Sequence, residues 1–337
     1  MPAEWEPQTA IQLTWPDRNS DWGANLGRVE PVYHAIVATI AQYQRVIISV
    51  SARADLSRLA HLYQNQAMVS VWLVENNDTW TRDHGPVSCY HNGRLRLQDF
   101  RFNGWGNRYP CDMDDRMTAI LHQAGAYGDV LLDRHEWVLE GGSLETDGRG
   151  TLLTTESCLL NANRNHGFSR LLIEHELRNS LGIERVIWLT QGKLDGDDTD
   201  GHIDTLARFC NPHTIAYCQA RHSDRHYESL KAMEFQLQGL RQTNGTPYQL
   251  MPLPLPSPIF NSQGARLPAN YANFLIINKA VLVPVYDVPE DSIAIERLMQ
   301  TFPQHRIHPV NCRAIIEQFG SLHCLTMQIH ADTSTLP

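Results

Sequence analysis

A cysteine near the C-terminus lies in a segment that could expose a nucleophile. Cys324 follows Gly320 and Ser321 in the run Gly-Ser-Leu-His-Cys-Leu-Thr-Met-Gln. The two small residues permit a tight turn, and a cysteine served by a histidine is a recurrent nucleophile. On a strand His323 would point away from Cys324, because side chains alternate, so His202 is the better partner. The alternative is a buried cysteine that only packs.

A histidine and a carboxylate form a second group in the run Asp-Asp-Thr-Asp-Gly-His-Ile-Asp that ends at Asp204. If residues 203, 205 and 207 form one face of a strand, His202 and Asp204 share the other face. This pairing predicts a general acid/base histidine beside a substrate-binding carboxylate. A metal site is the alternative, but such sites usually need three or four ligands, and no second motif supplies them.

Two further segments carry carboxylates next to residues suited to ligand contact. Trp80 and Asp83 follow a predicted strand, and an aromatic face beside a carboxylate suits a flat, delocalised cation. Glu140 precedes two glycines, which permit close approach of the backbone to a ligand. The alternatives are that the Trp80–Asp83 segment holds only a structural ion pair and that the Glu140 segment has only a structural role. Asp147 and Gly148 predict a tight hairpin turn.

Short β-branched runs and helical periodicities alternate along the chain and predict an α/β fold. No linker divides the sequence, so we expect a single catalytic domain over residues 1–337. Prolines at every second position predict an extended surface segment over 251–259. Strands are predicted at 46–50, 69–74, 130–132, 186–189, 274–277 and 281–285, and helices at 29–40, 55–63, 115–123, 169–181, 224–240, 289–302 and 311–319.

Composition excludes several classes of protein. The 337 residues are 42% hydrophobic with a formal charge of −9, which disfavours a general polyanion binder and mildly favours cationic partners. Seven scattered cysteines without a Cys-x-x-Cys pair indicate free thiols in a reducing compartment. The N-terminus has no basic region followed by an apolar one, and no membrane-length apolar stretch occurs, so we expect a cytoplasmic protein.

Taken in order, the motifs resemble the guanidino-group-modifying, or pentein, superfamily. Within it the chain is similar to the agmatine deiminase and bacterial peptidylarginine deiminase family over nearly its whole length. The resemblance implies a five-bladed α/β propeller of ββαβ units with pseudo-fivefold symmetry, although no repeat is obvious by eye. It rests on the opening Met-Pro-Ala-Glu-Trp-Glu-Pro, Phe102-Asn-Gly-Trp-Gly106, Glu140-Gly-Gly142, Gly201-His-Ile-Asp204 and His323-Cys-Leu-Thr-Met-Gln328.

The resemblance also implies roles for individual residues. Cys324 would be the nucleophile, His202 the general acid/base, and Asp83 and Asp204 the ligands of a guanidinium group. Trp80 and Glu140 would support substrate binding, and Asp198 would reach the far amine of agmatine. Relatives carry Gly-Gly-Gly-Asn before the His-Cys pair, whereas this chain has Gln318-Phe-Gly-Ser321, and that departure leaves the substrate preference open.

The expected activity is deimination of agmatine to N-carbamoylputrescine through a cysteine thiouronium intermediate, in a polyamine route. No lysine or arginine lies within three residues of Cys324, so we expect the bound guanidinium to help ionise the thiol. The rivals are a deiminase of peptidyl or free arginine, for which Arg101 and Arg108 are candidate carboxylate clamps, and a non-catalytic guanidine or polyamine binder. We expect no metal, cofactor, nucleic acid or membrane partner, and self-association into a homo-oligomer stays open.

Overall fold

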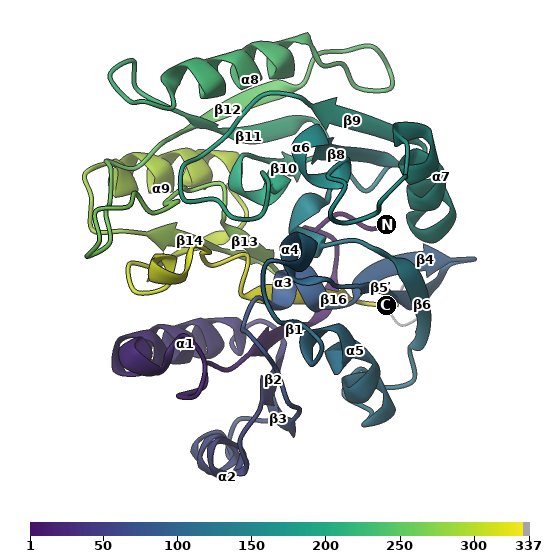
Figure 1. Ribbon diagram of the computed structural model, residues 1–337, viewed down its shortest axis with the longest axis vertical. Coiled ribbons are helices and arrows are strands. Elements are labelled where there is room, and N and C mark those ends of the chain that lie inside the picture. The colour runs from purple at the N-terminus through teal and green to yellow at the C-terminus, as the bar shows by residue number, and fades with distance from the viewer. Residues whose placement is uncertain (333–337) are drawn as a thin grey trace.

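The computed structural model describes residues 1–332 and arranges their strands in five sheets. Each sheet contains two antiparallel strands and, after a helical crossover, a strand that runs parallel to the second one. The first sheet has one further parallel strand. Parallel neighbours need such a long crossover, and a helix is its usual form. Figure 1 shows the five sheets around a central region that contains the short helices α3 (Thr81–His84) and α4 (Gly104–Asn107). The chain is therefore a five-bladed α/β propeller of ββαβ units.

The units follow one another along the chain. The first combines β16 (Thr326–His330), β1 (Gln8–Thr14), α1 (Leu26–Ile40), β2 (Arg45–Val50), α2 (Arg53–Leu62) and β3 (Val69–Leu73). The second and third are β4 (Val87–His91), β5 (Arg94–Arg101), α5 (Asp114–Gln123) and β6 (Leu131–Val138), then β7 (Glu145–Thr146), β8 (Thr151–Thr155), α6 (Glu156–Leu159), α7 (Arg170–Leu181) and β9 (Arg185–Leu189). The last two are β10 (Ala207–Asn211), β11 (Thr214–Gln219), α8 (Tyr227–Gly239) and β12 (Gln249–Pro254), then β13 (Leu275–Ile277), β14 (Ala280–Val285), α9 (Glu290–Thr301) and β15 (Arg306–Asn311).

The first unit joins the two ends of the described chain. β16 pairs antiparallel with β1, placing Ile11 opposite Gln328, and β1 pairs parallel with β2. A propeller closed in this way carries its last strand into its first sheet. Because the pairing is antiparallel, residues just after β16 lie beside residues just before β1, and the Ala331 N–H donates a hydrogen bond to the Pro7 carbonyl.

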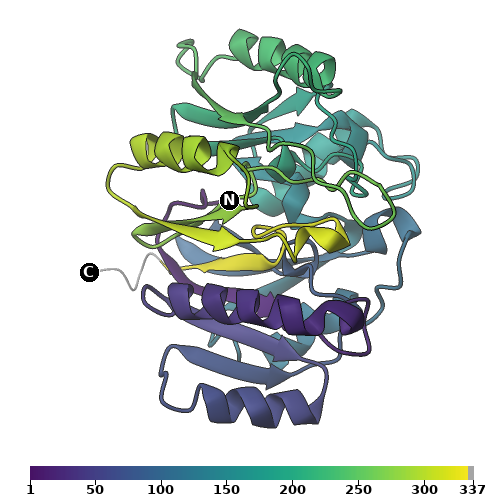
Figure 2. The same cartoon turned by 90° about the vertical axis from the view of Figure 1, so that its left-hand side faces the viewer.

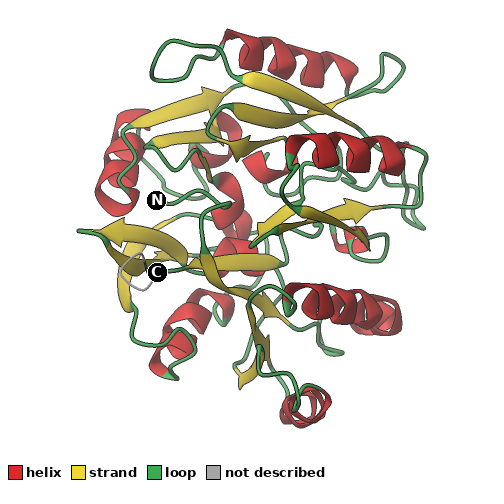
Figure 3. Cartoon of the chain, turned by 180° about the vertical axis from the view of Figure 1, so that it is seen from behind, coloured by secondary structure: helices red, strands yellow, loops and turns green. Residues whose placement is uncertain are grey.

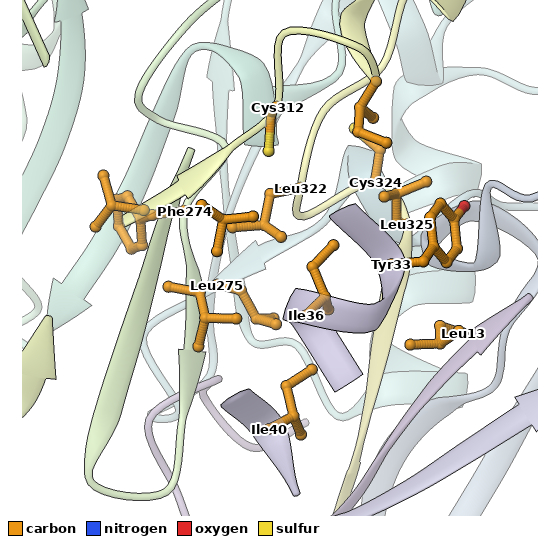
Figure 4. Packing of buried hydrophobic residues seen from close by; sticks show 14 of the residues in the cluster. Leu13, Tyr33, Ile36, Ile40, Phe274, Leu275, Cys312, Leu322, Cys324 and Leu325 are labelled. Atoms are coloured by element: carbon orange, nitrogen blue, oxygen red, sulfur yellow. The ribbon is translucent and has the colours of Figure 1, made fainter. Parts of the chain in front are cut away.

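The long helices cover the outside of the ring, as Figures 2 and 3 show. α1 buries one face, made of Val29, Tyr33, Ile36, Val37 and Ile40, because its apolar residues recur at the helical spacing. Figure 4 shows Ile36 and Ile40 near Leu275 and Leu322, and Tyr33 beside Leu325; this cluster extends to Cys324. The nucleophile candidate therefore lies at the edge of an apolar core.

The structure confirms most of the predicted elements, with boundaries shifted by a few residues. It also confirms the hairpin turn: Gly148 has a φ of 70°, and Asp147 Oδ1 accepts hydrogen bonds from the N–H groups of Arg149 and Thr151. Part of the predicted extended segment at 251–259 lies in the edge strand β12, but its Leu253 is buried, so this segment is not purely superficial. No helix of residues 1–332 has the length and apolar character needed to cross a membrane.

The predicted helix over 311–319 is wrong. Asn311 is the last residue of β15, and its side chain accepts a hydrogen bond from the Arg313 N–H, which starts a turn. Only a short 3₁₀ turn, Ile316–Gln318, follows, and it ends at Phe319 with a φ of 66°. The apolar residues of this stretch are buried almost consecutively, because the core surrounds the turn, and their spacing imitates a helix.

Candidate active site

The candidate site residues lie in the connections that lead from one unit into the next. Asp83 immediately precedes the second unit, Glu140 the third, and His202 and Asp204 the fourth. Cys324 precedes β16, which returns to the first unit. The fifth position is held by Asn273, just before β13, a residue that sequence reasoning did not identify. The pseudo-fivefold arrangement thus places one segment of the site in each connection between successive units.

Cys324 lies in a turn and is 8% exposed. Its Sγ lies 3.3 Å from Asn273 Nδ2 and 3.7 Å from Asp204 Oδ2. Asn273 Oδ1 accepts hydrogen bonds from the backbone N–H groups of His323 and Cys324 and also lies 3.5 Å from the sulfur, so both atoms of this amide face Cys324. Burial raises the pKa of Cys324 well above its usual value, and the carboxylates of Asp204 and Asp83 add to this effect.

His202 lies between two carboxylates. Its Nε2 is 2.7 Å from Glu140 Oε2, and its Nδ1 is 3.5 Å from Asp83 Oδ1. Burial opposes the charged imidazolium, but Asp83, Cys158 and Glu140 outweigh that effect and raise the pKa of His202 well above its usual value. The histidine is therefore held in the protonated form, ready to donate a proton.

The predicted strand that would place His202 and Asp204 on one face does not exist. His202 caps a 3₁₀ turn, Ile203–Thr205, and strand pairing begins only at Ala207. Gly201, with a φ of 89°, turns the backbone just before it. Both side chains are nevertheless buried near Cys324, because the turn, rather than strand alternation, directs them inward.

Asp83 is held by two donors from other connections. Its Oδ2 accepts a hydrogen bond of 2.9 Å from Trp105 Nε1, and its Oδ1 accepts one of 2.9 Å from the Gly142 N–H. Burial raises the pKa of Asp83 to about 6, although His202 acts in the opposite direction. A Cβ atom on Gly142 would lie 2.4 Å from His202 Nδ1, so the second glycine of the predicted motif is needed for this close approach.

A cleft of about 130 Å³ leads to Cys324. Aromatic side chains of Trp80, Trp105, Tyr109 and Phe319 line it together with Asp83 and His202. Asp204 and Glu140 are fully buried and are not among the lining residues, and Asp204 lies beside Cys324 beneath the base of the cleft.

The outer part of the cleft is acidic. Asp21, Asp78 and Asp198 line it, and Asp198 Oδ2 accepts a hydrogen bond of 2.9 Å from the Tyr109 hydroxyl. Burial raises the pKa of Asp78 to about 6, and nearby Asp21 adds to the shift, because two carboxylates share this region. The cleft therefore carries negative charge both at its base and at its entrance.

Neither arginine considered as a carboxylate clamp is free in the cleft. Arg108 is hydrogen-bonded to the Asp198 carbonyl and forms an ion pair with Asp200. Arg101 is exposed and lines a separate depression with Phe102 and Asn103. The structure thus gives both arginines positions outside the inner cleft.

Among the described residues, Glu140, Cys158 and His202 form a cluster whose donor atoms lie within 4.8 Å of one another, close enough for a metal ion. Arg164 Nε, however, lies 2.9 Å from each oxygen of the Glu140 carboxylate. A cation would have to displace or face this guanidinium, so the donor set fits an ion-paired histidine better than a metal ligand set. Arg164 also pairs with Asp200 and was not identified from the sequence.

Comparisons with known proteins agree with this geometry. A family model described as Porphyromonas-type peptidyl-arginine deiminase matches residues 1–329. The chain belongs to this family. Its members hydrolyse carbon–nitrogen bonds of amidine groups, so the chain is a member of an enzyme family.

Individual proteins similar to this chain extend the comparison. The agmatine deiminase of Ectopseudomonas mendocina is 34% identical, with 97% of this chain and 94% of the relative covered. The structure of a C. jejuni agmatine deiminase with bound substrate has a TM-score of 0.90 at 34% identity, covering 98% of this chain and 96% of that one. A Porphyromonas gingivalis structure, provisionally assigned as an arginine deiminase, has a TM-score of 0.90 at 45% identity, with 97% of each chain covered.

Proposed function

We propose that this protein is an agmatine deiminase, which hydrolyses agmatine to N-carbamoylputrescine and ammonia in putrescine, and hence polyamine, biosynthesis. We further propose that the five units act as one catalytic domain. The observation that carries the proposal is a buried thiol flanked by carboxylates at the base of a cleft with a second acidic group at its entrance. Agmatine is a cation at both ends and complements this distribution of charge.

The charge around Cys324 favours a cationic electrophile over an acyl group. Acyl transfer develops an oxyanion, which needs hydrogen-bond donors rather than carboxylates. A guanidinium instead presents N–H groups to carboxylates, and each charge pair at about 4 Å contributes about 4 kcal/mol at an effective dielectric of about 20, before desolvation. Asp83 and Asp204 take this role in the proposal, and Trp80 contributes an aromatic wall for the planar group.

In the first half-reaction the Cys324 thiolate attacks the guanidinium carbon. A carbon–sulfur bond forms, protonated His202 gives its proton to one amino group, and that group leaves as ammonia. The product is a thiouronium adduct on Cys324. Glu140 supports the step by holding the His202 ring at 2.7 Å.

In the second half-reaction water attacks the same carbon. His202, now neutral, accepts one proton from the water, and the carbon–sulfur bond breaks as the ureido carbonyl forms. The remaining hydroxyl proton passes to the released ammonia, and the neutral ureido product leaves. The sulfur departs as the thiolate and His202 is protonated again, so the starting state is restored. The overall balance is one guanidinium plus one water giving one urea group and one ammonium ion.

The far amine of the substrate is assigned to the acidic entrance. Asp198 is held by Tyr109, with Asp21 and Asp78 in the same lining. An arginine substrate would bring a carboxylate to this region, where Arg108 is already engaged with Asp200 and the Asp198 carbonyl. This arrangement favours agmatine over free arginine.

The test is ammonia release from the purified protein with agmatine, free arginine or a blocked arginine amide, with Cys324→Ala as the control. The proposal expects turnover of agmatine alone and none in the variant. Activity restricted to the arginine forms would keep the mechanism and assign the rival substrate. Tight agmatine binding without ammonia release would instead support the non-catalytic guanidine binder.

A further inference from the structure

A buried histidine links the N-terminal segment to Asp204. His323 Nδ1 lies 2.8 Å from Asp204 Oδ2, and His323 Nε2 lies 2.8 Å from Glu4 Oε2. His323 and Asp204 are almost completely enclosed, and Glu4 is 7% exposed. The carboxylate–imidazole–carboxylate chain, Glu4 to His323 to Asp204, therefore runs through the interior next to Cys324.

Asp204 is oriented by this chain. Its Oδ2 is occupied by His323 and lies 3.7 Å from the Cys324 sulfur, whereas its Oδ1 is buried without a hydrogen-bond partner among residues 1–332. A buried, unpaired carboxylate oxygen is costly, so such an atom is usually kept for a ligand. If the His323 contact were lost, the carboxylate could rotate and satisfy that oxygen elsewhere.

Glu4 is itself fixed. Its Oε2 is 2.7 Å from Arg208 Nη2, and its Oε1 accepts a hydrogen bond of 2.7 Å from the Ile276 N–H. Arg208 is shared with a second carboxylate, since its Nε is 2.5 Å from Glu145 Oε2. Glu4 and Glu145 thus make comparable contacts with one buried arginine, but of the two only Glu4 is hydrogen-bonded to His323 among the described residues.

We propose that His323 and Glu4 are positioning residues that orient the Asp204 carboxylate for the guanidinium group. The inference rests on the proposed function, since it assigns the partners of one of its guanidinium ligands. It also makes the segment before β1 part of the catalytic apparatus, although that segment lies far from Asp204 in the sequence. In this proposal His323 orients the Asp204 carboxylate and does not act on the Cys324 sulfur.

The first test compares substitutions of the two glutamates that contact Arg208. Glu4→Gln keeps an oxygen for the Ile276 N–H but replaces the carboxylate oxygen 2.8 Å from His323 Nε2 with an uncharged amide group, and Glu145→Gln makes the same chemical change away from His323. The readout is calorimetric binding of methylguanidinium in a Cys324→Ser background, which prevents the covalent step. We expect Glu4→Gln to weaken binding about tenfold, Glu145→Gln to leave it within about twofold, and Glu4→Asp to restore part of the loss. Equal weakening by both glutamine variants would reduce Glu4 to a structural role and overturn the proposal.

The second test changes His323 itself. The side-chain nitrogen of asparagine can take the place of histidine Nδ1, so His323→Asn retains a donor toward Asp204 but loses the Glu4 contact. His323→Leu loses both. We expect methylguanidinium affinity to fall in the order wild type, His323→Asn, His323→Leu, with a loss of about a hundredfold for the last variant. Unchanged binding in a folded His323→Leu protein would refute the role.

These experiments separate the two proposals. Ammonia release from agmatine by the unmodified protein tests the deiminase activity alone. If that assay fails but the binding order holds, the positioning role stands and the reaction is reassigned. If turnover is found but the binding order does not hold, only the positioning role is lost.

Discussion

At the scale of single residues, negative charge beside the proposed nucleophile, Cys324, separates this site from many cysteine enzymes. Such enzymes commonly lower the thiol pKa with a nearby cation or a helix N-terminus. Here burial raises the pKa of Cys324, and Asp204 and Asp83 raise it further. The group that can reverse this effect is a cationic substrate, because it neutralises the carboxylates next to the sulfur.

Binding of a guanidinium should therefore lower the pKa of the Cys324 thiol. An opposite charge at a few ångströms changes a pKa by about 1 to 3 units, and a cation favours the thiolate. The measurement is the pH dependence of thiolate absorbance near 240 nm, as the difference between wild type and Cys324→Ser, with and without methylguanidinium. We expect the midpoint to move at least about one unit lower when the ligand is present. A ligand-independent midpoint would contradict substrate-assisted ionisation.

A second residue-scale prediction concerns Trp105, which donates a hydrogen bond to Asp83. The indole N–H favours the ionised carboxylate and so opposes the burial that raises the pKa of Asp83 to about 6. Trp105→Phe keeps an aromatic ring but removes this donor, so the pKa should rise. Because the carboxylate must be ionised to bind a cation, the acid limb of kcat/KM should move to higher pH. Trp137 packs in a hydrophobic cluster that does not include Asp83, so Trp137→Phe should leave the acid limb of kcat/KM unchanged.

At the scale of elements, connections rather than strands carry the site. The run containing Glu140 and two glycines, and the run containing His202, were recognisable because their residue types are unusual together. Their local shape was not, since a 3₁₀ turn and a strand are both compatible with His-x-Asp. Asn273 and Arg164 escaped notice because a lone asparagine or arginine carries no pattern. The equivalence of Asn273 to the other site positions becomes visible only when the hairpins are known, because Asn273 precedes β13 as Asp83 precedes β4 and Glu140 precedes β7.

The glycine of one connection gives an element-scale prediction. A Cβ atom on Gly142 would lie 2.4 Å from His202 Nδ1 and 2.7 Å from Asp83 Oδ1, so Gly142→Ala must separate these side chains. A displacement of about 1 Å at a catalytic group can cost about a hundredfold in rate, and we expect kcat/KM for agmatine to fall by that order. Gly239→Ala in α8 is the control, because nothing lies within 4 Å of the added carbon. Equal activity of the two variants would show that the close approach is not needed.

At the scale of the whole molecule, closure of the ring brings the two ends of the sequence to one site. Alternating strands and helices predicted an α/β fold, and the family resemblance implied the propeller, but the sequence pattern did not show that Glu4 meets His323. That contact joins residues separated by most of the chain, and the Glu4 carboxylate is also held by Arg208 of β10 and the Ile276 N–H of β13. Local periodicity contains no information about such pairings, because it reports only which face of an element is apolar.

The last prediction concerns Arg208, which joins several parts of the ring. Its guanidinium contacts Glu4 before β1, Glu145 of β7, and the carbonyl oxygens of Ala272 and Phe274. Arg208→Met keeps much of the side-chain volume but leaves two buried carboxylates without their cation, which typically costs about 3 to 5 kcal/mol of unfolding free energy. Urea denaturation should show this loss, whereas Arg116→Met, which removes an exposed ion pair with Asp112, should cost less than about 1 kcal/mol.

The deficit of Arg208→Met should also depend on pH. Burial already raises the pKa of Glu145 to about 7, even with Arg208 beside it, whereas for Glu4 burial is outweighed by Arg208 and His323, which hold its pKa below the usual value. Removing the arginine raises both pKa values in the folded state. Carboxyl groups whose folded pKa exceeds the unfolded value bind more protons when folded, so their contribution to stability improves as the pH falls through the folded pKa. The difference between Arg208→Met and wild type should therefore be smaller at pH 6 than at pH 8. A deficit that is constant or grows on acidification would mean that lost packing, rather than uncompensated charge, accounts for the destabilisation.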